Sequence, residues 1–504
     1  MNASTCLFFF YLLFNLQISS SQHIPDKIFA ARINKQCPRC IKMNADSTGE
    51  LTPAAAELKR LDIALVKRNE IYKTDTARYK QQIRRLQQNQ EKLNGFFKDS
   101  AEIQKFKKIF PNFSIEDVKT VLNLNGIEGF KNLVELNCSN NDLKTLPALP
   151  ETLQILICVG NNLTKIEKLS PALTKLDCSD NQLTELPFLP VNLLDLDCEK
   201  NYLTAINISQ LALERLSCSD NQLYVLPDLP KNLLKLDCNN AQLTIIPALP
   251  NGLIELECAH NLLEKLPYLP DSLRELDCSF NRFTTLQNLP DRLKRLACTN
   301  NLLKTLPPLG KNLSFLDASY NEDLSYLPLL PLSLIRLLIN NCGLMTLPNL
   351  PIGLRDLRVG YNHLIEIPEL PFTLNELYCA GNQLTKLPDL SIRDSAVLKL
   401  PGFNPGLIFL DCSFNHIKEI KILSPRLLEM NCAHNEFKYL PQLPESLETL
   451  NCSSNLSLAC LPHLPDNLKT LEVKETIITC LPNKPKSFTI SPENLNKICT
   501  ENCK

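Results

Sequence analysis

The sequence contains no tryptophan, four methionines, six histidines and only 13 glycines among 504 residues. No Walker loop, GxSxG or HExxH motif is present, and no histidine lies at a recognisable spacing from a nucleophile. His260 and His434, which share a place in the repeat described below, are expected to be exposed turn residues. We therefore expect neither an enzyme nor a site for a cofactor or a metal ion.

An excess of charge of one sign is also missing. Lysine and arginine total 53 against 54 acidic residues, which gives a net charge of −1. No tract is basic enough to change this balance locally. These features argue against a general nucleic-acid binder.

Long apolar runs are absent except at the start of the chain, where residues 6–16 read CLFFFYLLFNL and small residues follow. This pattern predicts a secretory signal peptide over residues 1–21, although no lysine or arginine precedes the apolar run. An uncleaved anchor is the alternative. No other stretch is long enough to span a bilayer. We therefore expect a secreted or cell-surface protein that has no transmembrane segment once the signal is removed.

A 20-residue period dominates the rest of the chain. Residues 173–192, LTKLDCSDNQLTELPFLPVN, give the unit clearly, and seventeen copies occupy residues 133–482. A fixed period in this range predicts a solenoid. The first leucines of the copies are residues 133, 153, 173, 193, 213, 233, 253, 273, 293, 313, 334, 354, 374, 407, 427, 447 and 468.

Each repeat position has a readable physical role, counted from its first leucine. Positions 1, 4 and 6 are apolar, which predicts a short strand that points these side chains into the core. Position 9 is asparagine in 14 of 17 copies, and its amide suits the backbone of its own turn and of the neighbouring one. Prolines such as Pro187 and Pro190 exclude a regular helix from the second half.

The pattern LxxLxCSxNxLxxLPxLPxx resembles the LPX-type leucine-rich repeats of bacterial effectors, the family of YopM and the IpaH-type ubiquitin ligases. The resemblance implies a leucine-rich-repeat solenoid with short parallel strands on a concave face, extended proline-containing segments on the convex side and an N-terminal α-helical cap. Two features depart from the family. Cysteine replaces the usual aliphatic residue at position 6, and only 22 residues follow Pro482, which leaves no room for a ligase domain.

Three further regions flank the array. Residues 22–51 are expected to form a polar linker that carries a CxxC motif. Residues 52–130 are rich in helix formers behind a Thr52-Pro53 start signal, and they predict helices that cover the open end of the solenoid. Residues 483–504 form a C-terminal tail.

The 21 cysteines divide into two groups. Thirteen occupy position 6, where alanine, isoleucine or valine replaces them in other copies, so we expect buried free thiols. Outside this ladder, a CxxC pair is open to thiol exchange, half a zinc site or a local disulfide. Two further pairs are positioned to tie down the last coil. The disulfide candidates are Cys37, Cys40, Cys460, Cys480, Cys499 and Cys503.

The outward positions carry the candidate binding surface. An acidic stripe runs along position 5, and because like charges on neighbouring strands repel, we do not expect it to serve stability. The sequence leaves two roles open for the stripe: it keeps the protein in solution, or it binds a partner. Its carboxylates are Asp177, Asp197, Asp237, Glu257, Asp277 and Asp317.

Farther along the array, aromatic residues and arginines replace the stripe. This composition is typical of interaction hot spots. Some of these rings are equally suited to cover the turn of the next coil. The predicted partner-binding residues are Phe280, Phe315, Tyr320, Arg336, Arg355, Arg358, Tyr361, Tyr378, Phe409 and Phe414. The one long insertion, SIRDSAVLKLPGFNPG, follows this region.

The sequence thus favours a non-enzymatic protein-binding solenoid, with an exported effector or scaffold that engages host proteins as the role implied by the resemblance. An envelope or surface protein with an adhesive or structural role is the alternative. A thiol-exchange enzyme that uses Cys37 and Cys40 is the third hypothesis.

Overall fold

The computed structural model describes residues 23–24, 27–37, 41–43, 49–51, 58, 60–62, 121–390, 406–485, 489–491 and 498–499. The predicted signal peptide, Cys40, Cys503 and most of the predicted insertion lie outside these residues. The same holds for residues 63–120 of the expected helical cap. In the part that is described, no helix is both long and apolar enough to cross a membrane.

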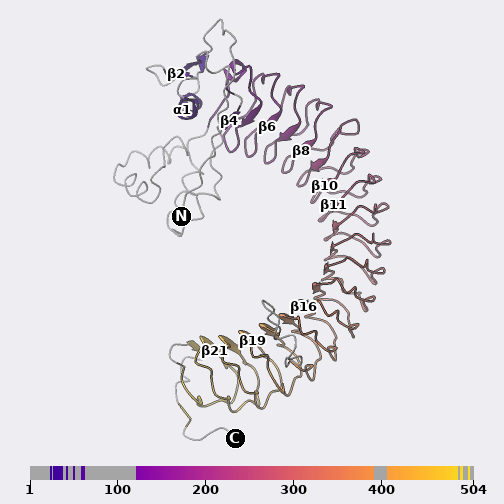
Figure 1. Ribbon diagram of the computed structural model, residues 1–504, viewed down its shortest axis with the longest axis vertical. Coiled ribbons are helices and arrows are strands. Elements are labelled where there is room, and N and C mark those ends of the chain that lie inside the picture. The colour runs from indigo at the N-terminus through magenta and orange to yellow at the C-terminus, as the bar shows by residue number, and fades with distance from the viewer. Residues whose placement is uncertain are drawn as a thin grey trace. The chain divides into compact units, whose positions relative to one another are not determined.

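The chain forms two compact units, residues 1–242 and 243–504, and in each the predicted coils stack through parallel three-residue strands (Figure 1). In the first unit, consecutive strands pair in the order β4 (Arg60–Asp62), β5 (Glu135–Asn137), β6 (Ile155–Ile157), β7 (Lys175–Asp177), β8 (Asp195–Asp197), β9 (Arg215–Ser217) and β10 (Lys235–Asp237).

The second unit repeats this parallel order over twelve strands. They are β11 (Glu255–Glu257), β12 (Glu275–Asp277), β13 (Arg295–Ala297), β14 (Phe315–Asp317), β15 (Arg336–Leu338), β16 (Asp356–Arg358), β17 (Glu376–Tyr378), β18 (Phe409–Asp411), β19 (Glu429–Asn431), β20 (Thr449–Asn451), β21 (Thr470–Glu472) and β22 (Thr489–Ser491).

Each strand coincides with repeat positions 3–5, so only position 4 points inward from the strand itself. Leu176 pairs in register with Leu156 on one side and Leu196 on the other, and all three are fully buried. Leucines at positions 1 and 11 and cysteines at position 6 complete this core. The register therefore stacks identical apolar side chains from coil to coil.

The asparagine ladder satisfies the turns, as predicted. The Asn181 amide donates to the carbonyls of Cys158, Cys178 and Ser179 at 3.0–3.1 Å, and its Oδ1 accepts the Leu163 N–H at 3.0 Å. At two of the three copies that lack this asparagine, another side chain replaces part of the bonding. The Cys342 thiol donates to the Ala318 carbonyl at 3.4 Å, and the Thr476 hydroxyl donates to the Val473 carbonyl at 2.8 Å.

The proline-rich half of each repeat is extended and ends in a tight turn. The Leu193 N–H, for example, donates to the Pro190 carbonyl at 3.0 Å, and this bond starts the next coil. Between the strands of residues 121–390 and 406–485, the described backbone contains one short 3-10 helix, η4 (Ile127–Gly129), and no α-helix. The expectation of extended proline-containing segments is confirmed.

The expected helical cap is wrong at residues 60–62. Leu58 and Leu61 are buried, and β4 pairs in register with β5, so β4 is the first rung of the sheet. Val121 then occupies position 11 of the same coil, because its N–H donates to Asn141 Oδ1 at 2.9 Å. A strand ladder overrides local helix propensity here. The coil is thus split, with residues 63–120 between its two halves.

The expected polar linker at residues 22–51 is also wrong. Helix α1 (Lys27–Gln36) lies beside a small antiparallel sheet of β1 (His23–Ile24), β3 (Gly49–Leu51) and β2 (Ile41–Met43). Phe29, Ala30 and Ile33 of α1 are fully buried, and the guanidinium of Arg32 donates to Asn141 Oδ1 at 2.8 Å. This element therefore contacts the first asparagine of the ladder.

The C-terminal tail adds to the second unit. Strand β22 pairs Ile490 with Leu471 of β21, and Leu481 bridges Ile498 in parallel. A disulfide joins Cys480 to Cys499. The tail is therefore fixed to the last repeat by backbone pairing and by a covalent link.

Candidate partner-binding face

The outward face of strands β13–β18 carries a continuous arrangement of cations and rings. We call it the Arg–aromatic cluster and define it by Arg295, Phe315, Arg336, Asp356, Arg358, Glu376, Tyr378 and Phe409. All eight occupy positions 3 or 5, the two positions that point away from the core. Parallel in-register pairing places equivalent side chains of adjacent strands side by side.

Cation–π contacts form the first half of the cluster. The Arg295 guanidinium lies 3.9 Å from the centre of the Phe315 ring, and the Arg336 guanidinium lies 5.6 Å from the same ring on the other side. A planar guanidinium stacks well on an aromatic face and keeps its N–H groups directed outward. Phe315 therefore positions two cations from neighbouring coils.

Asp356 lies at the centre of the cluster. Its side chain is 8% exposed, and both carboxylate oxygens are occupied. Arg336 donates two hydrogen bonds to Oδ2 at 2.9 and 3.1 Å, and Arg358 donates one to Oδ1 at 3.0 Å. Charge-assisted bonds of this kind fix the planes of both guanidinium groups.

The second half of the cluster extends from Arg358. Its Nη2 donates to Glu376 at 3.0 Å, and its guanidinium lies 4.3 Å from the centre of the Tyr378 ring. Tyr378 in turn stacks on Phe409 with ring centres 4.3 Å apart. One chain of contacts thus links six consecutive strands, from β13 to β18.

The structure brings five of the ten predicted partner-binding residues into this cluster: Phe315, Arg336, Arg358, Tyr378 and Phe409. Arg355 is exposed just before β16 and takes no part in the contacts within the cluster. The sequence argument missed Arg295, Asp356 and Glu376. Aligning Asp356 with Arg336 in the repeat register is the signal that identifies it, because the two occupy the same position in adjacent copies.

The other four predicted residues, Phe280, Tyr320, Tyr361 and Phe414, lie at position 8 in the turn after the strand. All four have a φ between 53° and 57°, a left-handed conformation that aromatic residues seldom adopt. Position 8 has this conformation in both units, so it is a requirement of the coil and not of a binding site.

Stacking offsets part of the cost of these aromatic turn residues. Phe280 stacks on His260 and Phe414 on His434, each with ring centres 4.0 Å apart. The Tyr361 ring lies so close to Gly381 that an added Cβ would come within 2.6 Å of it. The turn rings therefore cover the turn of a neighbouring coil, although each keeps about half of its surface exposed.

The acidic stripe has a local structural role that the sequence argument missed. A carboxylate at position 5 accepts a hydrogen bond from the backbone N–H two residues later: Asp177 accepts from Ser179 at 3.2 Å, and Asp277 accepts from Ser279 at 3.0 Å. Asparagines at the same position, such as Asn451, make the same bond. These side chains therefore stabilise the turn that ends each strand.

Charge repulsion nevertheless acts within the stripe. Burial and, to a smaller extent, the neighbouring Asp177 raise the pKa of the Asp197 carboxyl to about 6, although the hydrogen bond from the Glu199 N–H acts in the opposite direction. Burial also raises the pKa of Asp237. The adjacent Asp195 is paired, since Lys175 and Arg215 contact its carboxylate at 2.9 and 3.1 Å.

Asp197→Asn is expected to stabilise the first unit by about 1 kcal/mol at pH 7.5, after allowance for solvent screening. The raised pKa means that the folded state binds the proton more tightly than the unfolded chain, so the carboxylate costs stability at neutral pH. The gain should be complete above pH ~6 and vanish below pH ~4. Urea unfolding of Asp197→Asn at pH 7.5 and again below pH ~4 measures the gain at each pH, with Asp277→Asn as the control. A gain independent of pH would contradict it.

The position-6 cysteines are buried free thiols, as predicted. Burial raises the pKa of the Cys158, Cys198 and Cys432 thiols well above the usual value, so they remain protonated and unreactive at neutral pH. Cys37 and Cys460 are disulfide-bonded, as are Cys480 and Cys499. Among the described residues, no group of three or more His, Cys, Asp or Glu side chains could hold a metal ion.

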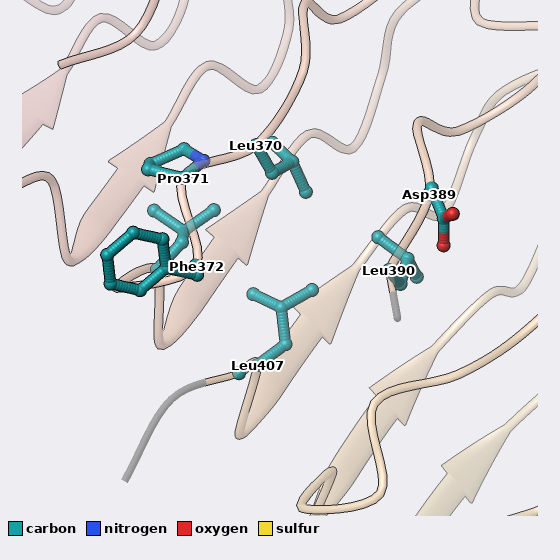
Figure 2. Close-up of a pocket in the computed structure, with 8 residues that line it drawn as sticks. Leu370, Pro371, Phe372, Asp389, Leu390 and Leu407 are labelled. Atoms are coloured by element: carbon teal, nitrogen blue, oxygen red, sulfur yellow. The ribbon is translucent and has the colours of Figure 1, made fainter. Parts of the chain in front are cut away.

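A small pocket lies beside the β17 coil, at the two ends of the predicted insertion (Figure 2). Among the described residues its lining is apolar apart from Asp389, and it includes Leu370, Phe372, Leu390 and Leu407. Residues 391–405, which complete this region of the chain, lie outside the described part. Apart from the Asp389 carboxylate, the described lining of the pocket offers no charged side chain to a ligand.

No protein-family model matches the sequence, and no curated protein matches it. Among solved structures, the chain is similar to YopM from Yersinia enterocolitica, with 37% identity, a TM-score of 0.62 and coverage of 71% of this chain and 82% of that one. YopM from Yersinia pestis, a leucine-rich effector protein, gives 31% identity and a TM-score of 0.49, with coverage of 57% of this chain and 85% of that one. A leucine-rich-repeat protein of Leptospira interrogans gives 25% identity and a TM-score of 0.44, with coverage of 69% of this chain and 91% of that one.

The stacked coils and the asparagine ladder define a leucine-rich-repeat solenoid. The extent of the first match places the chain among the leucine-rich-repeat proteins, where its similarity is to bacterial effectors.

Proposed function

We propose that this chain is a non-enzymatic leucine-rich-repeat protein that binds a partner protein through the Arg–aromatic cluster. The observation that carries the proposal is the chain of contacts from Arg295 to Phe409, which orders six aromatic or guanidinium planes at the surface. The nearly buried Asp356 bonds directly to two of them. Arginine and aromatic residues dominate binding hot spots because they combine large contact area with directed hydrogen bonds.

Pre-organisation supports a binding role for the cluster over a purely solubilising one. A solubilising face needs mobile, hydrated charges, whereas these guanidinium groups have already lost their rotational freedom to Asp356, Glu376 and the rings. A partner that contacts them therefore pays less conformational entropy on binding.

The proposal extends to an LPX-type effector or scaffold that leaves the producing bacterium and engages a host protein. Similarity to YopM over most of that protein's length supports this role. Recovery of the chain in the envelope of the producing cell would instead favour an adhesive or structural surface role.

A photo-crosslinking amino acid placed at Tyr378 is expected to form an adduct with a host protein, because this side chain lies inside the cluster. The same group at Tyr268, which is 76% exposed in the proline-rich half of its repeat, is the matched control. Arg336→Ala, Asp356→Ala and Arg358→Ala made together should abolish the Tyr378 adduct with little change in the melting temperature, since the nearly buried carboxylate is removed with both of its partners and no charge is left unpaired. Equal adducts at both positions would place the site elsewhere.

A further inference from the structure

The charges on the strand face of the second unit are arranged in three blocks. Positions 2, 3 and 5 of the four coils that contain β13–β16 carry five cations and two carboxylates. The coils of β11 and β12 carry four carboxylates and one arginine at these positions. Those of β18–β20 carry three carboxylates and no cation. The cations of the central block are Lys294, Arg295, Arg336, Arg355 and Arg358.

The cations of this central block are only partly neutralised within the chain. Asp356 pairs with Arg336 and Arg358, but each guanidinium uses only its Nε and Nη2 atoms for the bonds it donates to carboxylates. Their Nη1 groups have no hydrogen-bond partner among the described residues. Lys294 and Arg355 are exposed and form no ion pair with the described part of the chain.

We infer that the central block binds a short, carboxylate-rich segment of the partner protein. Guanidinium groups held in fixed planes bind carboxylates through paired N–H donors, and Phe315 offers apolar contact beside them. The acidic blocks on either side repel the same segment, so they fix its position along the array. This inference rests on the proposed function and specifies the chemistry of the partner.

The length of the block favours a peptide segment over a nucleic acid. Four strands about 4.8 Å apart span roughly 15 Å, the reach of four or five extended residues. A longer polyanion would continue onto the carboxylates of β12 or β18, such as Asp277 and Asp411. Arginine and aromatic residues suit a carboxylate flanked by an apolar side chain.

The probe is a fluorescein-labelled twelve-residue peptide in which about five central residues are Glu, Asp and Phe and the flanks are Gly. It is compared with the same peptide carrying Gln and Asn in place of the acids. By fluorescence anisotropy with the full chain, the acidic peptide should bind at least tenfold more tightly at low salt, and the difference should shrink as NaCl is raised. Lys294→Gln with Arg355→Gln should weaken its binding roughly threefold to tenfold, because the ion pairs around Asp356 stay intact.

Lys265→Gln with Arg292→Gln makes the same change in net charge at exposed positions outside the three blocks and should leave binding unchanged. Equal affinity for the two peptides, or equal loss in both double variants, would overturn the inference. Tighter binding of a 30-nucleotide single-stranded DNA than of the acidic peptide would overturn it in favour of a nucleic acid. If the inference about an acidic segment fails in one of these ways, the crosslink at Tyr378 should still form. If the chain with an intact cluster forms no adduct at Tyr378, the proposed function itself is refuted.

Discussion

Asn281→Ala is expected to lower the free energy of unfolding of the second unit by about 3 kcal/mol. The asparagine is buried, its Oδ1 accepts the Leu263 N–H at 3.0 Å, and its amide donates to the carbonyls of Cys258 and Cys278 at 2.9 and 3.1 Å. Alanine leaves the Leu263 N–H without a partner and takes one of two amide donors from each carbonyl, since Asn261 and Asn301 still donate to Cys258 and Cys278. A buried N–H left unsatisfied costs about 1–3 kcal/mol, and each hydrogen bond lost by a carbonyl that keeps a second donor costs about 0.5–1.5 kcal/mol.

Urea unfolding followed by circular dichroism measures this loss. Asn251→Ala is the matched control, because Asn251 is exposed in the turn before β11 and its side chain makes no bond of this kind. Asn281→Asp should be at least as harmful at neutral pH, since a carboxylate would face carbonyl oxygens that now accept hydrogen bonds. If Asn281→Ala had no more effect than the control, the ladder would not hold the coils together.

The regular part of the fold could be predicted from the sequence because every repeat position meets the same neighbours. Leucine at position 4 and asparagine at position 9 each stack on their own equivalents in adjacent coils, so a pattern along the chain becomes a ladder in space. Natural exceptions fit this explanation. Cys342 replaces an asparagine, and its thiol donates to the position-6 carbonyl of the previous coil, Ala318.

The candidate site was only partly predictable, because its geometry depends on pairs 20 residues apart. Asp356 follows Arg355 directly in the sequence, which suggests that these two form a pair. In the structure, Asp356 instead contacts Arg336 of the previous coil and Arg358 on its own strand. Composition pointed to the three rings and to two of the three arginines, whereas Arg295 and the carboxylate of Asp356 are found only through the register of the sheet.

The acidic stripe illustrates a different difficulty. Repulsion between like charges on neighbouring strands is a sound expectation, and the raised pKa of Asp197, caused first by burial and then by Asp177, agrees with it. These carboxylates accept hydrogen bonds from N–H groups only two residues farther along the chain, in a turn that the repeat pattern alone did not specify. Local turn bonding and repulsion between strands therefore act on the same side chains in opposite directions.

Leu61→Ala is expected to destabilise the first unit by roughly 2–5 kcal/mol, as much as Leu236→Ala in a regular coil, because both leave a cavity in a packed ladder. Leu61 is fully buried and pairs with Leu136, while Leu236 is 1% exposed. The sequence argument assigned Leu61 to a helix, since helix formers surround it and 75 residues separate Leu58 from Leu133, which hides the period.

The same substitution tests whether the solenoid begins at β4 or at β5. If β4 is its first rung, the loss caused by Leu61→Ala should appear in the cooperative unfolding of the first unit measured in urea. Leu122→Ala is the control, because Leu122 is 60% exposed in the second half of the same coil. If Leu61→Ala lowers the free energy of unfolding by an amount within about 0.5 kcal/mol of that control, Leu61 behaves as a surface residue. The sheet would then begin at β5, and β4 would belong to the predicted cap. A full core penalty would instead mean that residues 63–120 interrupt a coil whose two halves still pack together.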